Sequence, residues 1–150
     1  DSQTVGAGSN PMLGNLLANA IAHTQRGGVL LAARRRAGGV VLEVRDTGRG
    51  VEAEPLKRLF EPGFQVPGAT REGGSGLGLA IVERLAQSLG HEVEVWSRPE
   101  RGSVFRLLTG SSTGHACASP GAASGAWKAG AARLVRSRPR RHPAPGAMRR

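Results

Sequence analysis

The chain has 150 residues, of which 21 are Lys or Arg and 11 are Asp or Glu, giving a net charge of +10. A single cysteine excludes an intrachain disulfide and a cysteine-based metal cluster, and with no signal peptide or long apolar run we expect a cytoplasmic chain without a membrane segment. Residues 109–150 hold eight basic and no acidic residues, while residues 1–108 hold 13 basic against 11 acidic, or +2. The body is therefore nearly neutral, and we expect no specific nucleic-acid partner.

The first predicted element is a helix over about 12–24, which contains the stretch NLLANAIAHT. Its apolar residues form one stripe at helical spacing, and Asn15, Asn19 and His23 follow a line beside that stripe. Asn is a mediocre helix former, so a ligand that uses carboxamide oxygens would explain the row. A solvated polar face with two incidental asparagines explains it equally well, and the stretch alone leaves both interpretations open.

The rest of the body is predicted to alternate strands and helices. The expected elements are strands at 28–35 and 39–46, a short helix at about 52–60, an irregular Gly-rich segment at 61–76, a helix at about 77–89 ending at Gly90, and strands at 91–97 and 102–108. Two hairpins and helices with one apolar face predict an α+β fold: a two-layer α/β sandwich, with helices on one face of a mostly antiparallel mixed sheet.

One domain is predicted at 10–108, between an irregular segment at 1–9 and a basic tail at 109–150. The tail is mostly Gly, Ala, Ser, Pro and Arg without periodicity, so we expect it to be disordered. Two interpretations fit the tail: a basic arm for nucleic acid or an anionic membrane surface, or a solvated segment without function.

The motif VRDTGRGV is the first candidate for binding chemistry. It places Asp46 at a strand end, where a carboxylate can accept a hydrogen bond from an exocyclic amine. Gly48 and Gly50 would let the backbone turn tightly and approach a planar ligand. An ordinary turn at the end of a strand has the same composition, so this motif alone is weak.

The motif GGSGLGLAIV is the second candidate, and it leads directly into a helix. Its alternating Gly74, Gly76 and Gly78 leave backbone N–H groups near the helix start open, where the helix dipole favours phosphates. It is not a Walker motif, because no Lys-Ser/Thr pair follows, and it does not follow a strand as a dinucleotide fingerprint would. A flexible Gly-rich loop remains the alternative.

Taken in order, NLLANAIAHT, DTGRG, LFEPGF and GSGLGLAIV resemble the four nucleotide-binding boxes of the ATP-binding domain of sensor histidine kinases. That domain belongs to a superfamily shared with gyrase, the heat-shock chaperone ATPase and the mismatch-repair ATPase. The resemblance covers residues 10–108 and includes the closing stretch VEVWSRPERGSVFRL. It implies a Bergerat-type fold that binds ATP and Mg²⁺.

The resemblance also implies roles for the first two boxes. Asn19 would coordinate the Mg²⁺ that bridges the ATP phosphates, and Asn15, one turn earlier, would support the phosphate and metal site. Asp46 would receive the adenine amino group. Gly48 and Gly50 would let the backbone pass close to the base.

The phosphate side and the lid follow from the other two boxes. The residues that would face the phosphates are Gly74, Gly76, Leu77 and Gly78. Residues 61–76 would form a lid, which Phe60 and Phe64 would grip against the body. Ile21 and Val51 are candidate apolar walls of the pocket.

Two positions depart from the family pattern. Lys or Arg often lies three residues after the metal-binding Asn in the family, and Ala22 stands here. Arg71, in the lid, is a candidate replacement, with a solvated lid charge as the alternative; His23 could contact phosphate or be a structural histidine. The strand that usually precedes the first box is also missing, so we expect an uncovered sheet edge and a less stable domain.

The first box also separates the branches of the superfamily. Its hydrolases and anti-sigma serine kinases carry Glu where this chain has Asn15, and Asn cannot activate a water molecule as a base. The resemblance therefore implies the bacterial histidine-kinase branch, in a two-component phosphorelay. None of the four histidines has the helical acidic and proline context of a phosphoacceptor.

The function expected from the resemblance is transfer of the ATP γ-phosphoryl to a histidine on a separate or missing dimerisation domain, with a response regulator as an indirect partner. The isolated chain should bind nucleotide and turn over little. Two alternatives remain: a degenerate fragment without catalysis, or a stand-alone ATPase or anti-sigma-type serine kinase.

Overall fold

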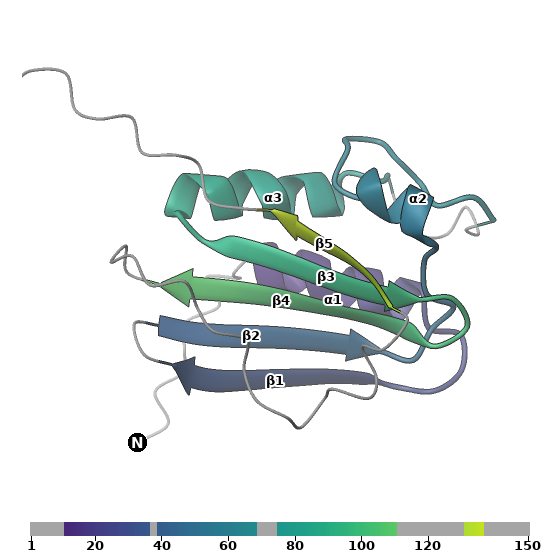
Figure 1. Ribbon diagram of the computed structural model, residues 1–150, viewed down its shortest axis with the longest axis horizontal. Coiled ribbons are helices and arrows are strands. Elements are labelled where there is room, and N and C mark those ends of the chain that lie inside the picture. The colour runs from purple at the N-terminus through teal and green to yellow at the C-terminus, as the bar shows by residue number, and fades with distance from the viewer. Residues whose placement is uncertain (1–10, 37–38, 69–74, 111–130, 137–150) are drawn as a thin grey trace, which may run out of the picture.

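Figure 1 shows the computed structural model, which describes residues 11–36, 39–68, 75–110 and 131–136. Its elements are helices α1 (Pro11–Ala22), α2 (Ala53–Lys57) and α3 (Gly78–Leu89), and strands β1 (Val29–Arg36), β2 (Gly39–Asp46), β3 (Glu92–Arg98), β4 (Gly102–Gly110) and β5 (Ala132–Arg136). Both hairpins and all three helices expected before residue 109 are confirmed, although α2 is shorter than predicted. No helix within the described residues is long and apolar enough to cross a membrane.

The strands form one sheet in the order β1-β2-β4-β3-β5. All four pairings between described strands are antiparallel, in agreement with the mostly antiparallel sheet that was predicted. The register places Val44 opposite Phe105, and Phe105 opposite Val95. These side chains therefore point to the same face of the sheet, which is the face that α1 and α3 cover.

The hydrophobic core lies between that face and the two longer helices. Helix α1, behind the sheet in Figure 1, contributes Met12, Leu16 and Ala20 at helical spacing. Helix α3 contributes Leu79, Val82 and Ala86, and the sheet contributes Val44, Val93, Val95, Phe105 and Leu107. The helix α3 ends as expected, because Gly90 adopts a left-handed conformation (φ 69°) and donates to carbonyls of the last turn. The predicted sandwich is confirmed.

Strand β5 is the main difference from the sequence prediction. Residues 109–150 were expected to be disordered, yet Ala132–Arg136 pair with β3 over five residues, and β4 extends to Gly110. Leu134 lies opposite Val95 and packs against the core. The strand therefore covers the edge of β3, and β1 and β5 are the two edge strands of the described sheet. The segment at 1–9 lies outside the described residues.

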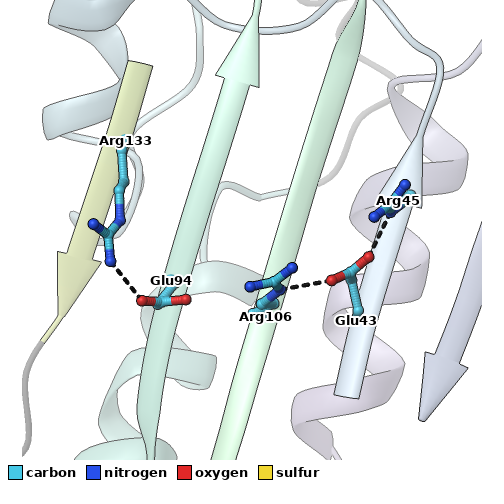
Figure 2. Close-up of polar contacts among 5 residues, drawn as sticks. All are labelled: Glu43, Arg45, Glu94, Arg106 and Arg133. Atoms are coloured by element: carbon cyan, nitrogen blue, oxygen red, sulfur yellow. Dashed lines mark hydrogen bonds and ion pairs between the residues drawn. The ribbon is translucent and has the colours of Figure 1, made fainter. Parts of the chain in front are cut away.

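The opposite face of the sheet carries buried charges, shown in Figure 2. Glu43 on β2 accepts from Arg106 on β4 at 2.6 Å and from its neighbour on β2, Arg45. Arg133 on β5 donates to Glu94 on β3 at 2.7 Å. The Trp96 ring lies between the two cations, 4.8 Å from the Arg106 guanidinium and 5.2 Å from that of Arg133. Arginines thus neutralise the carboxylates of this face.

Candidate functional site

A pocket opens at the end of β2 where the sheet meets α1 and the loop before α2. Its enclosed volume is small, about 20 Å³, and it is continuous with open solvent. Its lining consists of Asn19, His23, Asp46, Gly50, Val51, Leu59, Val66, Ser103 and Phe105. Four of the residues singled out in the sequence (Asn19, His23, Asp46 and Gly50) therefore come together, although they are separated by up to 31 positions in the chain. Apolar walls with a few convergent polar groups are typical of small-molecule sites.

Asp46 is the most unusual polar group of the pocket. Its residue is only 5% exposed, and its Oδ1 accepts the backbone N–H of Gly48 at 2.9 Å and that of Ser103 at 3.3 Å. Within the described residues no Lys, Arg or His forms an ion pair with it. Burial raises the pKa of Asp46 above its ordinary value, and the two backbone donors offset only part of that effect. The carboxyl group keeps acceptor capacity for a further donor.

Two buried serines, Ser97 on β3 and Ser103 on β4, lie beside Asp46, and the backbone N–H of Ser103 donates to the Asp46 carboxylate. The Ser97 hydroxyl, fully buried, lies 2.8 Å from the Ser103 hydroxyl and accepts the backbone N–H of Val51 at 2.7 Å. Ser103 lies opposite Asp46 in the β2–β4 register. The sequence analysis missed both serines, because only the strand register brings them next to the DTGRG motif.

The two glycines of that motif also have a role within the protein itself, beside the ligand approach expected of them. A Cβ on Gly48 would lie 2.1 Å from the carbonyl O of His23, and one on Gly50 would lie 1.9 Å from the carbonyl O of Arg98. Gly50 also adopts a positive φ of 64°. Both glycines are thus required by close contacts within the protein itself, which hold this loop against α1 and the β3–β4 turn.

The three polar residues predicted to follow one line of the first helix, Asn15, Asn19 and His23, lie in two different places. Asn19 and His23 line the pocket. Asn15 lies one turn earlier, with its Oδ1 3.2 Å from where a Cβ on Gly78 would stand, so it packs against the start of α3. Of the two expected apolar walls, Val51 is confirmed, whereas Ile21 is wrong, because it is 64% exposed.

Two residues of basic type, His23 and Arg49, lie at this end of the molecule. Burial lowers the pKa of His23, and the nearby charge of Arg49 lowers it further, so both effects favour the neutral imidazole. Arg49 is partly buried, and its Nη2 atom has no hydrogen-bond partner. No ion pair involves Arg49 in the part of the chain that the structure describes. The sequence analysis did not single out this arginine.

The residues predicted to form or grip the lid do not share one location. Phe60 is buried in the core, and Phe64 lies under the guanidinium of Arg58 at 4.6 Å; neither lines the pocket. Gly63 donates its backbone N–H to Gly76 at 3.1 Å, which closes the base of the segment. Leu77 is exposed just before α3. Two predicted residues, Arg71 and Gly74, lie outside the described residues.

The family model described as histidine kinase-, DNA gyrase B- and HSP90-like ATPase matches residues 10–110. The chain belongs to this family. The four boxes, the sandwich and the pocket between them agree with that membership, and the α+β fold with an open antiparallel sheet is the family's ATP-binding fold.

Relatives within the family are sensor kinases. The chain is 43% identical over 98 residues to the sensor-like histidine kinase SenX3 of Mycobacterium bovis, an alignment that covers 63% of this chain and 24% of that protein. Among solved structures, full-length ShkA in complex with AMPPNP matches with a TM-score of 0.57 and 36% identity over 69% of this chain and 22% of that one. The mycobacterial sensor histidine kinase MprB matches with a TM-score of 0.60 and 27% identity. This match covers 67% of this chain and 70% of the MprB chain. The chain thus spans about a quarter of the length of SenX3 and of ShkA.

Proposed function

We propose that this chain binds Mg·ATP and serves as the catalytic domain of a sensor histidine kinase. The observation that carries the proposal is the buried carboxyl of Asp46, which has two backbone donors, no cation and remaining acceptor capacity, in one pocket with Asn19. Family membership and the AMPPNP complex of ShkA support the same ligand.

The base end of the pocket fits an adenine. Asp46 would accept a hydrogen bond from the exocyclic amino group, while Val51, Leu59 and Val66 supply apolar walls for the ring. The Ser97–Ser103 pair would keep the backbone of Val51 in place relative to Asp46 during binding. A guanine, which presents a carbonyl where adenine presents the amino group, would meet the carboxylate unfavourably.

The other end of the site fits a phosphate-bound metal. Asn19 would offer its carboxamide oxygen to Mg²⁺, which favours oxygen ligands and retains several waters. Gly76 and Gly78 stand at the start of α3, where free N–H groups and the helix dipole favour anions. Asn15, packed on Gly78, would keep α1 and α3 aligned at this point. His23 and the lid residues Arg71 and Gly74 remain candidates for further phosphate contacts.

Bound Mg·ATP would supply the γ-phosphoryl group, and a histidine on another domain, in the same or a separate polypeptide, would attack it. The residues of this chain would position the nucleotide and neutralise its charge. Asn15 stands where a hydrolase would need a base, so we expect little ATP hydrolysis by the chain alone. A response regulator would receive the phosphoryl group afterwards.

Thermal unfolding with and without Mg·ATP tests the proposal. A ligand that binds only the folded state stabilises it by about 2.7 kcal/mol at 100 times its dissociation constant. We expect an upward shift of Tm for the wild type, no shift for Asp46→Asn, and a shift that no longer depends on Mg²⁺ for Asn19→Ala.

A transition that ignores nucleotide in the wild type would contradict the proposal and favour a degenerate domain. Rapid hydrolysis by the isolated chain, abolished in Asn19→Ala, would instead favour a stand-alone ATPase.

A further inference from the structure

Arg49 stands out because its backbone is held in a fixed place while its guanidinium has no ion-pair partner among the described residues. It occupies the middle of DTGRG, between Gly48 and Gly50, each of which is pressed against a backbone carbonyl. Its own carbonyl accepts the N–H of Glu100 at 2.7 Å. The backbone at Arg49 is therefore fixed from three sides, and the direction of its side chain is largely set by the fold.

The guanidinium reaches the lid side of the pocket. Its Nη1 lies 3.9 Å from where a Cβ on Gly68 would stand, two residues beyond Val66 of the pocket lining. Its charge also acts on His23, which lines the pocket from α1. Arg49 thus stands close to groups on both the α1 side and the lid side of the pocket.

The buried Nη2 atom donates no hydrogen bond, and Arg49 joins no ion pair within the described ranges. A buried donor of a charged group without an acceptor destabilises the free protein. Arg106, the fully buried arginine of the described residues, is by contrast neutralised by its pair with Glu43. An anionic ligand would supply the acceptor that Arg49 lacks.

The geometry points to Arg49 as a phosphate-binding residue of the nucleotide site, which takes the place of the cation absent at position 22. This inference rests on the proposed function and adds one residue to it. Asp46 and Arg49 belong to one rigid loop, so the same backbone would recognise the amino group of the base and the negative charge of the phosphates. A guanidinium suits phosphate oxygens because it offers several N–H donors in one plane.

Titration calorimetry of the 150-residue chain with adenosine, ADP and Mg·ATP tests this assignment. Arg49→Met keeps the apolar stem and removes the guanidinium, Arg49→Lys keeps the charge, and Arg84→Met removes an exposed arginine of α3 as a matched control. We expect Arg49→Met to weaken ADP and Mg·ATP binding by about tenfold to a hundredfold and to leave adenosine binding within about twofold. Arg49→Lys should recover part of the loss, and the control should change none of the three.

Thermal unfolding of the ligand-free variants is a second test, in which the substitution should not lower Tm although it lowers phosphate affinity. Because the unpartnered donor destabilises the free chain, Arg49→Met should keep or raise its Tm while it loses phosphate affinity. Equal losses for adenosine and Mg·ATP, or unchanged affinity for all three, would overturn the assignment while leaving the proposed function intact. A wild type that binds none of the three ligands would overturn both.

Discussion

Strand β2 presents two buried carboxylates three residues apart, one on each face of the sheet. Their surroundings shift their pKa values in opposite directions. Glu43 points to the face shown in Figure 2, where Arg45 and Arg106 both donate to it. Burial alone would raise the pKa of Glu43, but the hydrogen bonds and charges of the two arginines lower it below its ordinary value. Asp46 points to the helix-covered face and has backbone donors alone, so its pKa is raised.

The difference separates what a buried charge does for folding from what it does for binding. The Glu43 pair is internally satisfied, which leaves it nothing to offer a ligand. Asp46 and Arg49 are less completely satisfied; Asp46 lines the pocket, and Arg49 directly precedes Gly50 of the pocket lining. A site of this kind carries a stability cost that a ligand offsets on binding. Substitutions on the two faces should therefore affect different measurements.

The largest effect is expected for Glu43→Ala. It leaves the buried guanidinium of Arg106 without its carboxylate, which should lower the free energy of unfolding by about 3–5 kcal/mol in urea titrations. Glu54→Ala, which breaks an exposed pair with Lys57, is the matched control and should cost less than about 0.5 kcal/mol. The Tm shift caused by Mg·ATP should persist in whatever Glu43→Ala protein remains folded. If Glu43→Ala lost the Mg·ATP-dependent Tm shift but kept its stability, Glu43 would be a binding residue and not a stabilising one.

Ser97→Ala should affect both stability and binding. It removes the acceptor of the Val51 N–H and the neighbour of the Ser103 hydroxyl, at a cost of about 1–3 kcal/mol. Because the Ser97 hydroxyl bonds that of Ser103, whose backbone N–H donates to Asp46, we also expect weaker Mg·ATP binding, and recovery of both properties in Ser97→Thr. Ser88→Ala, on the exposed side of α3, should change neither. A loss of stability with unchanged affinity would show that the pair does not position the pocket.

Strand β5 allows the two faces to be compared at adjacent residues. Leu134 packs against the core, so Leu134→Ala should lower the free energy of unfolding by about 1–2 kcal/mol. Arg133, on the paired face, is half exposed, and Arg133→Ala should cost less than about 1 kcal/mol. Equal stability of the wild type and a chain ending at Gly110 would show that β5 does not contribute to the domain.

The smallest effect is a difference in pH dependence. The pKa of Asp46 is raised in the folded state, so protonation of this group favours folding as the pH falls through that raised value toward its ordinary 3.8. The pKa of Glu43 is lowered, so its contribution is complete above its ordinary 4.5 and is lost as the pH falls through the lowered value. Between pH 7 and pH 3, stability should therefore fall more steeply than wild type in Asp46→Asn and less steeply in Glu43→Gln. Parallel curves for the three proteins would contradict these opposite shifts.

Much of the fold followed from local patterns. The apolar stripe on α1, the left-handed Gly90 after α3 and the two hairpins were predicted because each depends on residues close in the chain. Strand β5 could not be predicted in this way. Its Leu134 and Val135 are two apolar residues between arginines, and they form a strand because β3 offers a free edge and the core offers a surface for Leu134.

The candidate site divides along the same line. The sequence alone determined which residue types could bind a nucleotide and in what order they occur, because the spacing of Asn15, Asn19 and the two glycine motifs is a local property. Tertiary structure alone decided that the backbone N–H of Ser103 donates to Asp46 and that Ile21 faces outward. It also decided that Arg49 lacks, among the described residues, the kind of partner that Arg106 has. Those outcomes depend on strand register and on the burial of charge, and both arise only when segments distant in the chain are brought together.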